Sequence, residues 1–271
     1  WESLFFESDE AATEIYTLAR RGALPISNTG FLTDAKDVGE ALLRAAGRHE
    51  QGMHWSVNGR QPVGLAQGAS GIALFLMHLH VATGERAFIE AARSALEFDF
   101  AQRRPNPDGD PSWPSSLEYG IPSPYLAQGT AGIVAVAARM YAVTGDRRYQ
   151  DMVLTGEADL FRPYAMHPGL FEGLAGIGET LLDLATFLPD RADIYLREAR
   201  KVAIGIEPFL IRRPDGLAIP GSRLLRLSCD LATGSAGVAM FFHRLRRGGF
   251  ASFMLDEHPP SMAGAQKTVS A

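Results

Sequence analysis

His167 is the residue of this chain best placed for proton transfer. It lies four residues before Phe171, in a loop that leads into a glycine-rich phrase. Because imidazole exchanges protons near neutral pH, a histidine there is a candidate general acid or base, although a surface histidine without a chemical role is an equal alternative. Further polar candidates stand close to phrases of the same kind: Glu172, Asp230, Gln128, Arg162 and Tyr164.

These polar side chains would supply the other parts of such chemistry. Glu172 and Asp230 could orient a base, although a carboxylate beside a glycine corner more often caps a helix. Gln128 could donate an amide hydrogen bond to a developing negative charge, or only bond within its own loop. Arg162 and Tyr164 could assist in stabilising the same charge. The candidate chemistry is therefore proton transfer coupled to stabilisation of an anion.

Four copies of one glycine phrase position these candidates. Each copy has a glycine, two further residues, a second glycine and then isoleucine or valine, and a leucine precedes the first glycine by three residues. Glycine at both ends lets the backbone turn tightly and lets neighbouring backbone approach closely. The copies are Gly68-Ala69-Ser70-Gly71, Gly129-Thr130-Ala131-Gly132, Gly173-Leu174-Ala175-Gly176 and Gly234-Ser235-Ala236-Gly237. Self-similarity at wide spacing indicates a fold of stacked units.

An apolar run follows each phrase, and amphipathic runs alternate with the apolar ones. Residues 72–77 are apolar on nearly all sides, which predicts a buried helix, whereas residues 87–98 carry a single apolar stripe. This alternation predicts an all-α fold of two concentric layers, an α/α toroid or an open solenoid, with the glycine corners on one rim. The inner helices are expected to start at Ile72, Ile133, Ile177 and Val238. Their N-termini would make the rim favourable to negative charge.

The chain before the first phrase is expected to hold two helices and a connector. Ser8 and Asp34 are capping residues that predict helices over 8–20 and 34–46. Residues 47–64 are polar and predict an irregular connector.

Three later segments are expected to be irregular. Residues 102–125 hold six prolines and predict a long loop. The outer helix of the second unit is expected to end near Thr155, and residues 217–227 predict a hairpin around Pro220-Gly221. The last dozen residues predict a tail.

Composition narrows the class of protein. The 271 residues are 46% hydrophobic, which suffices for one large domain. The net charge of −5, without a basic stripe, argues against nucleic acid and anionic membranes as partners. The single cysteine, Cys229, and the absence of a signal peptide predict a cytoplasmic protein. Because the sequence begins at Trp1, we expect a piece of a longer protein.

The repeated Leu-x-x-Gly-x-x-Gly corners before buried helices resemble the lanthionine synthetase C-like family. The fold of that family is an α/α toroid, and its members close thioether rings in ribosomal peptides. Residues 220–228 and 230–238 are most similar to the cyclase domain of class III lanthipeptide synthetases. The resemblance covers roughly residues 60–247. We therefore expect N-terminal helices and a connector over 1–60, a lanthionine synthetase C-like cyclase domain over 61–250 and a tail over 251–271.

The resemblance also implies a substrate and partners. The substrate would be a dehydrated precursor peptide, whose cysteine thiols add to dehydroalanine or dehydrobutyrine to give lanthionine or labionin. The partners would be kinase and lyase domains of the same polypeptide, the kinase using a nucleoside triphosphate.

Zinc-dependent members of the family differ from this chain at three positions. They place cysteine two residues before the third phrase and Cys-His directly before the fourth, where this chain has Phe171, Ala232 and Thr233. Zinc needs thiolate or imidazole ligands, so we expect no zinc and no other cofactor in this domain. Zinc-free cyclase domains are what the class III resemblance implies.

Ring closure without a metal must produce a thiolate, stabilise an enolate and deliver a proton. A free thiol has a pKa near 8.5, so forming thiolate at pH 7 costs only about 2 kcal/mol. A nearby base or the helix N-termini could offset that cost. Two alternatives remain: a non-catalytic scaffold that holds peptide for attached domains, and a glycan-cleaving toroid, for which the sequence offers no persuasive carboxylate pair.

Overall fold

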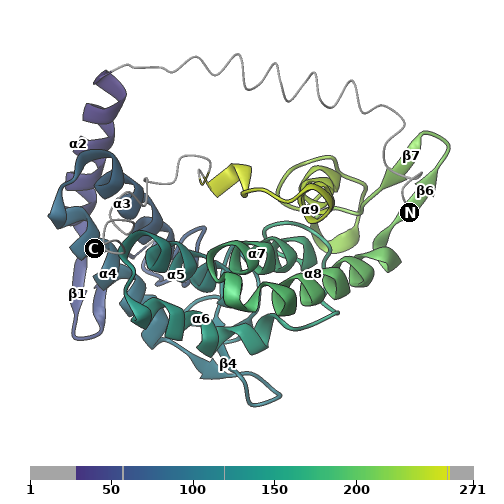
Figure 1. The fold of residues 1–271 in the computed structure, drawn as a ribbon, viewed down its shortest axis with the longest axis horizontal. Coiled ribbons are helices and arrows are strands. Elements are labelled where there is room, and N and C mark those ends of the chain that lie inside the picture. Colours follow the sequence, from purple (N-terminus) through teal and green to yellow (C-terminus); the bar gives the residue numbers. More distant parts are fainter. Residues whose placement is uncertain (1–28, 57, 119, 255, 257–271) are drawn as a thin grey trace, which may run out of the picture.

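The computed structural model describes residues 29–56, 58–118, 120–254 and 256, and the chain within them is mainly helical (Figure 1). The helices are α2 (Thr29–Ala45), α3 (Ala69–Thr83), α4 (Arg86–Ala101), α5 (Thr130–Thr144), α6 (Arg147–Leu160), α7 (Leu174–Phe187), α8 (Ala192–Ile206) and α9 (Ser235–Arg247). Short 3-10 turns are η1 (Pro189–Arg191), η2 (Glu207–Phe209), η3 (Ser222–Leu224) and η4 (Ser252–Met254). None of the described helices is both long and apolar enough to span a membrane.

The helices form two layers along an arc. The inner helices α3, α5, α7 and α9 contact one another in that order, and α4, α6 and α8 each pack outside the inner helix of their own unit (Figure 1). Helix α5 is buried along nearly its whole length, whereas α8 alternates buried and exposed positions. The expected all-α, two-layer toroid arrangement is therefore confirmed. The inner helices begin three residues earlier than expected, directly after the first glycine of each phrase, at Ala69, Thr130, Leu174 and Ser235.

A ladder of backbone hydrogen bonds joins the four glycine corners. The rungs connect equivalent positions, each two residues before the first glycine of its phrase. Ala66 N donates to Ala127 O at 2.8 Å, Ala127 N donates to Phe171 O at 2.8 Å, and Phe171 N donates to Ala232 O at 2.9 Å. Successive corners are thus held in register along one rim.

The second glycine of each phrase is required by its own corner. A Cβ on Gly71 or Gly176 would lie 1.9 Å from the carbonyl oxygen of the leucine that opens the phrase, and Gly132 and Gly237 would place one at 2.4 and 2.2 Å. No side chain fits at such distances, so the helix can begin directly over that carbonyl only with glycine.

Buried carboxylates on the outer helices bind the first residues of the first two inner helices, and that of α4 accepts a backbone N–H as a cap does. Asp99 of α4 accepts hydrogen bonds from Gly64 N at 3.0 Å, Ser70 N at 2.8 Å and Ser70 Oγ at 2.7 Å. Asp159 of α6 accepts a short hydrogen bond from the Thr130 hydroxyl. Burial raises the pKa of Asp99 to about 6, which partly offsets the value of this cap at neutral pH.

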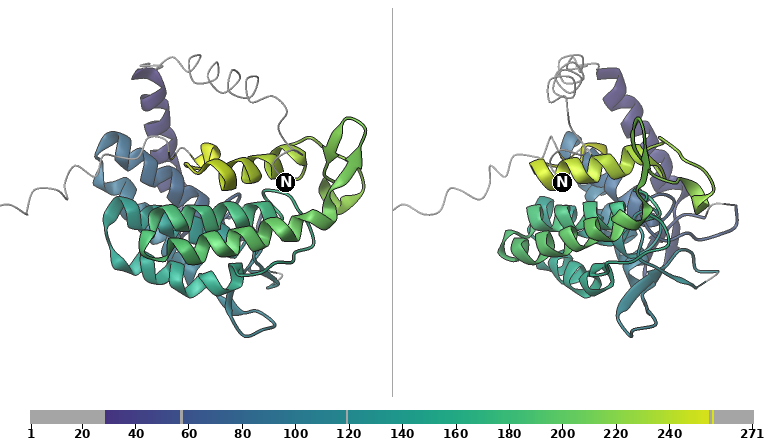
Figure 2. Two further views of the ribbon diagram at one scale, coloured as in Figure 1. Left: turned by 45° about the vertical axis from the view of Figure 1, so that its right-hand side comes forward. Right: turned by 90° about the vertical axis from the view of Figure 1, so that its right-hand side faces the viewer.

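In the described part of the chain, three small antiparallel sheets lie in the connections. They are β1 (Gly47–His49) with β2 (Gly52–His54); β3 (Arg104–Pro105), β4 (Pro111–Pro114) and β5 (Pro122–Ser123) in that order; and β6 (Ile211–Arg213) with β7 (Gly216–Ala218). Figure 1 and the left view of Figure 2 show the β6–β7 hairpin standing out from the helices beside α9.

Several local predictions were wrong. The proline-rich segment is a three-stranded sheet, not a loop, because Trp113 is fully buried and its ring N–H donates to Phe100 O at 3.0 Å. Helix α6 continues past Thr155 to Leu160, since Leu160 is itself buried in the core. The hairpin turns at residues 214–215 and not around Pro220-Gly221.

The predictions for the two ends of the chain are tested only where the structure describes the residues. Helix α2 already includes Thr29, so it starts before the expected cap Asp34, and the connector after it holds the β1–β2 hairpin. The helix expected over 8–20 and the tail of the last dozen residues lie outside the described part of the chain.

Candidate functional site

The third and fourth corners meet at a small cavity on the glycine rim. It is lined by His167 and Glu172 from the third corner, by Thr233 from the fourth, and by residues 221–223. Its volume of about 10 Å³ is room for roughly one water molecule. The structure thus brings together two of the residues predicted to form a site.

His167 is half-buried at this cavity. Its carbonyl oxygen accepts a hydrogen bond from Leu174 N at 3.0 Å, which ties the histidine to the first turn of α7. Its Nδ1 is buried and has no hydrogen-bond partner among the described residues. A buried ring nitrogen without a partner is one that a water molecule or a reacting group can occupy.

The two carboxylates predicted at the rim have different surroundings. Glu172 is exposed at the edge of the cavity, next to the glycine that starts the third phrase. Asp230 accepts a short hydrogen bond from the Ser228 hydroxyl, and further bonds from Thr233 N at 2.7 Å and Thr233 Oγ1 at 2.9 Å. These bonds lower the pKa of Asp230 to about 2, so the carboxylate is ionised at neutral pH. Its bonds to Ser228 and Thr233 hold the backbone of the fourth corner in place.

The remaining predicted residues lie apart from this cavity. Gln128 donates to Gln67 Oε1 at 3.2 Å, which links the second corner to the first. Arg162 is bound to Asp159 through both its Nε, at 2.6 Å to the backbone oxygen, and a short ion pair to the carboxylate. Tyr164 is 80% exposed. None of the three lines the cavity.

Two residues at the rim were missed by the sequence predictions. The Tyr125 hydroxyl accepts a hydrogen bond from Met166 N at 3.3 Å, so it holds the loop of His167 against the second corner. Arg223 lines the cavity with a left-handed φ of 55°, and Leu224 follows with 58°. Such angles are strained for bulky residues and favour a functional reason for the conformation. Tyr125 directly precedes Leu126, the leucine of the second phrase, and Arg223 lies within the family-like stretch 220–228, so both positions border sequence signals.

The positions that would hold zinc do not fit the metal. The corner ladder places Phe171 directly beside Ala232, and neither side chain, nor that of Thr233, offers a thiolate or imidazole. Cys229 is exposed, and no group of three or more His, Cys, Asp or Glu residues in the described chain is arranged to bind a metal ion.

A layer of polar residues crosses the inner helices deeper in the arc, and its three charged members are buried. The residues ten positions after the first glycine of each phrase are His78, Arg139, Asp183 and Arg244, one on each inner helix. Arg139 and Asp183 form an ion pair at 2.8 Å, and Asp183 and Arg244 form one at 2.7 Å. The four residues share one position of the repeat, but their pairing across repeats is evident only in the assembled fold.

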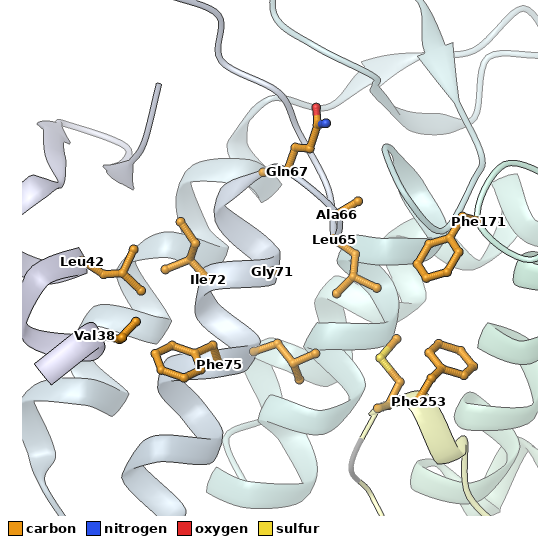
Figure 3. A pocket seen from close by; sticks show the side chains of 13 residues that line it. Val38, Leu42, Leu65, Ala66, Gln67, Gly71, Ile72, Phe75, Phe171 and Phe253 are labelled. Atoms are coloured by element: carbon orange, nitrogen blue, oxygen red, sulfur yellow. The ribbon is translucent and has the colours of Figure 1, made fainter. Parts of the chain in front are cut away.

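An apolar pocket lies inside the arc. Its volume is about 630 Å³, and its walls are apolar side chains of α2, α3, the first corner, Phe171 and the segment after α9. Figure 3 shows Leu65, Ile72 and Phe75 lining it, with the amide of Gln67 directed away from them. Phe171 thus links the pocket to the third corner.

Comparison with known proteins agrees with this geometry. The model of the lanthionine synthetase C-like protein family matches residues 15–160, which is more than half of the chain. The chain belongs to the lanthionine synthetase C-like family. The resemblance stated from the corner phrases is thereby confirmed.

One curated relative is a probable SapB synthase from Streptomyces coelicolor (strain A3(2)/M145). It is 29% identical to this chain over 187 residues, which are 66% of this chain and 19% of the relative. The match therefore spans about a fifth of the length of that relative.

Proposed function

We propose that this lanthionine synthetase C-like chain is a zinc-independent cyclase domain that adds peptide cysteine thiols to dehydroalanine or dehydrobutyrine. The observation that carries the proposal is the cavity between the third and fourth corners. It combines an unpartnered imidazole nitrogen of His167 with the carboxylate of Glu172, at the place where the corner ladder carries no zinc ligand.

The proposed reaction uses His167 twice. Its ring nitrogen accepts the thiol proton as sulfur forms the C–S bond to the β-carbon of the dehydrated residue. The electron pair of the C=C bond moves toward the carbonyl as an enolate, and the imidazolium returns the proton to the α-carbon. Atoms and charge balance without a further reagent, and the product is a thioether ring.

The enolate is the charged intermediate that the rim must stabilise. Arg223 lines the cavity together with Thr233 of the fourth corner, so its guanidinium is a cation beside the proposed site. We assign Arg223 this role in preference to Arg162, whose guanidinium is already bound to Asp159. Glu172 would orient the imidazole, and Asp230 would fix the corner that carries Thr233.

We further propose that the parent protein is a class III synthetase. Support comes from the corner stretch 220–238 and from the relative, of which four fifths lie outside the match. Kinase and lyase domains of the same polypeptide would dehydrate the precursor peptide, using a nucleoside triphosphate. The ring would be lanthionine or labionin.

A peptide-holding scaffold is the second candidate function. It is favoured by the contacts of Asp230 and Arg162, which are both engaged within the chain. Both functions predict peptide binding, but only the cyclase predicts bond formation.

The test is mass spectrometry of a dehydrated precursor peptide incubated with the purified chain. Thiol alkylation before analysis counts the remaining free cysteines. A cyclase removes thiols faster than the same peptide cyclises alone in buffer. An equal rate with and without the chain would support the scaffold and refute the cyclase.

A further inference from the structure

The segment after α9 folds back into the arc. Its described residues, 251–254 and 256, form what we call the strap, and in it Ala251, Met254 and Asp256 are all at most 5% exposed. Figure 1 and the views of Figure 2 place its η4 turn on the open side of α5 and α7, between α9 and α3. The strap is therefore seated on the inner side of the arc of helices.

A charged anchor and an aromatic contact hold the strap in place. The Asp256 carboxylate pairs with the buried Arg139 guanidinium, with Nε donating to Oδ1 at 2.7 Å and a short second bond to Oδ2. Phe253 packs against Phe171, with ring centroids 6.3 Å apart. In Figure 3 these two rings lie together at one side of the apolar pocket.

The buried charges of the helices are balanced without the strap. Arg139 and Arg244 carry two positive charges, and Asp183 and Glu179 carry two negative charges at ion-pair distances of 2.6 to 2.8 Å. Asp256 adds a further negative charge from outside the helices. Because Arg139 keeps Asp183 as its partner when Asp256 leaves, release of the strap strands no buried cation.

The strap also fills space beside the third corner. Phe253 and Met254 form one wall of the 630 Å³ pocket whose other walls include Phe171 and the first corner. A peptide that enters the arc of helices to reach Phe171 would meet this wall. The strap has the chemistry of such a peptide, with an aromatic side chain three residues before a carboxylate.

We propose that the strap occupies a peptide-binding site inside the arc of helices. This site takes a peptide segment in which an aromatic residue precedes an acidic residue by three positions. The aromatic ring packs on Phe171 and the carboxylate pairs with Arg139. The strap and the precursor peptide then compete for the site. Only the identification of the competing peptide as the precursor rests on the proposed function, because peptide binding itself requires no catalysis.

The experiment measures binding of a labelled peptide in trans. The probe is a fluorescent peptide with the sequence of residues 249–257, and its partner is the full chain carrying Asp256→Asn. If the strap fills the site at least nine-tenths of the time in the unaltered chain, the variant binds the peptide at least about tenfold more tightly than the unaltered chain does. A peptide with asparagine in place of its first acidic residue should lose that affinity.

Controls separate this outcome from general loosening of the fold. Asp215→Asn breaks an exposed ion pair with Arg213 at 3.0 Å and should bind as the unaltered chain does. The double variant Phe253→Ala/Asp256→Asn removes both anchors and should bind at least as tightly as the single one. Equal affinity of all variants, or of both peptides, would overturn the proposal, as would variants that melt early and bind neither peptide. Ring closure by a chain that fails this binding test would leave the proposed function standing.

Discussion

At the scale of single residues, the surroundings of each side chain decide which polar groups are available for chemistry. His167 has a buried nitrogen without a partner, whereas Asp230 is saturated by three donors that keep it ionised. The sequence could place both beside a corner, but it could not distinguish them, because the difference lies in contacts made by Ser228 and Thr233. Tyr125 and Arg223 became visible for the same reason only in three dimensions.

Asp99 provides a prediction at this scale. Its pKa is raised by burial to about 6 from an ordinary value of 3.8, so its contribution to stability is full below pH 3.8 and is lost as the pH rises through 6. The shift of about two pKa units corresponds to roughly 3 kcal/mol of unfolding free energy. Replacing Asp99 by Asn should remove this dependence.

Urea denaturation of both proteins between pH 4 and pH 8 tests the Asp99 prediction. The difference in unfolding free energy between Asp99→Asn and the unaltered chain should change in favour of the variant as the pH rises. A difference that is constant with pH would contradict a perturbed Asp99.

At the scale of elements, the glycine phrase accounts for most of what could be predicted. Its recurrence predicted where the inner helices lie and in which order. The prediction holds because the second glycine packs on the leucine carbonyl in every corner, so each phrase starts a helix in the same way. The connections could not be predicted in the same way. Residues 102–125 form a sheet around buried Trp113, and proline content alone does not reveal a tertiary contact of that kind.

The corner geometry predicts that Gly176→Ala is costly. Its Cβ would lie 1.9 Å from Leu170 O, so the start of α7 must shift, with a loss of about 1–3 kcal/mol or more. Gly84→Ala is the matched control, since it has no atom within 4 Å and only a left-handed φ of 75°. That conformation costs roughly 1–2 kcal/mol. Thermal unfolding of both variants should rank Gly176→Ala as the less stable, and the reverse order would refute the corner account.

At the scale of the whole molecule, the arc is held by a corner ladder on one rim and a buried ionic layer beneath it. Asp183 is central to that layer because it pairs with both Arg139 and Arg244. The sequence showed that the inner helices are apolar but did not draw attention to these charges, whose partners come from three different repeats. Their burial became evident only once the helices were assembled.

Asp183→Asn should therefore destabilise the whole arc. Removing one partner from buried ion pairs typically costs about 3–5 kcal/mol, because charge is left uncompensated. Asp215→Asn at the exposed pair with Arg213 should change stability by less than about 1 kcal/mol. Chemical denaturation of the two variants gives the comparison, and similar stabilities would show that the layer contributes little.

The measurement that tests the central claim most directly is the rate of ring closure by His167→Ala. On a dehydrated precursor peptide, thiol loss should slow by about ten- to a thousandfold relative to the unaltered chain, in line with the loss of general acid–base help. The melting temperature should barely change, since the substitution removes a ring nitrogen that has no partner among the described residues. His49→Ala, in strand β1 and not among the residues that line the cavity, is the control and should cyclise at the unaltered rate. An unchanged rate with His167→Ala would contradict the proposed mechanism.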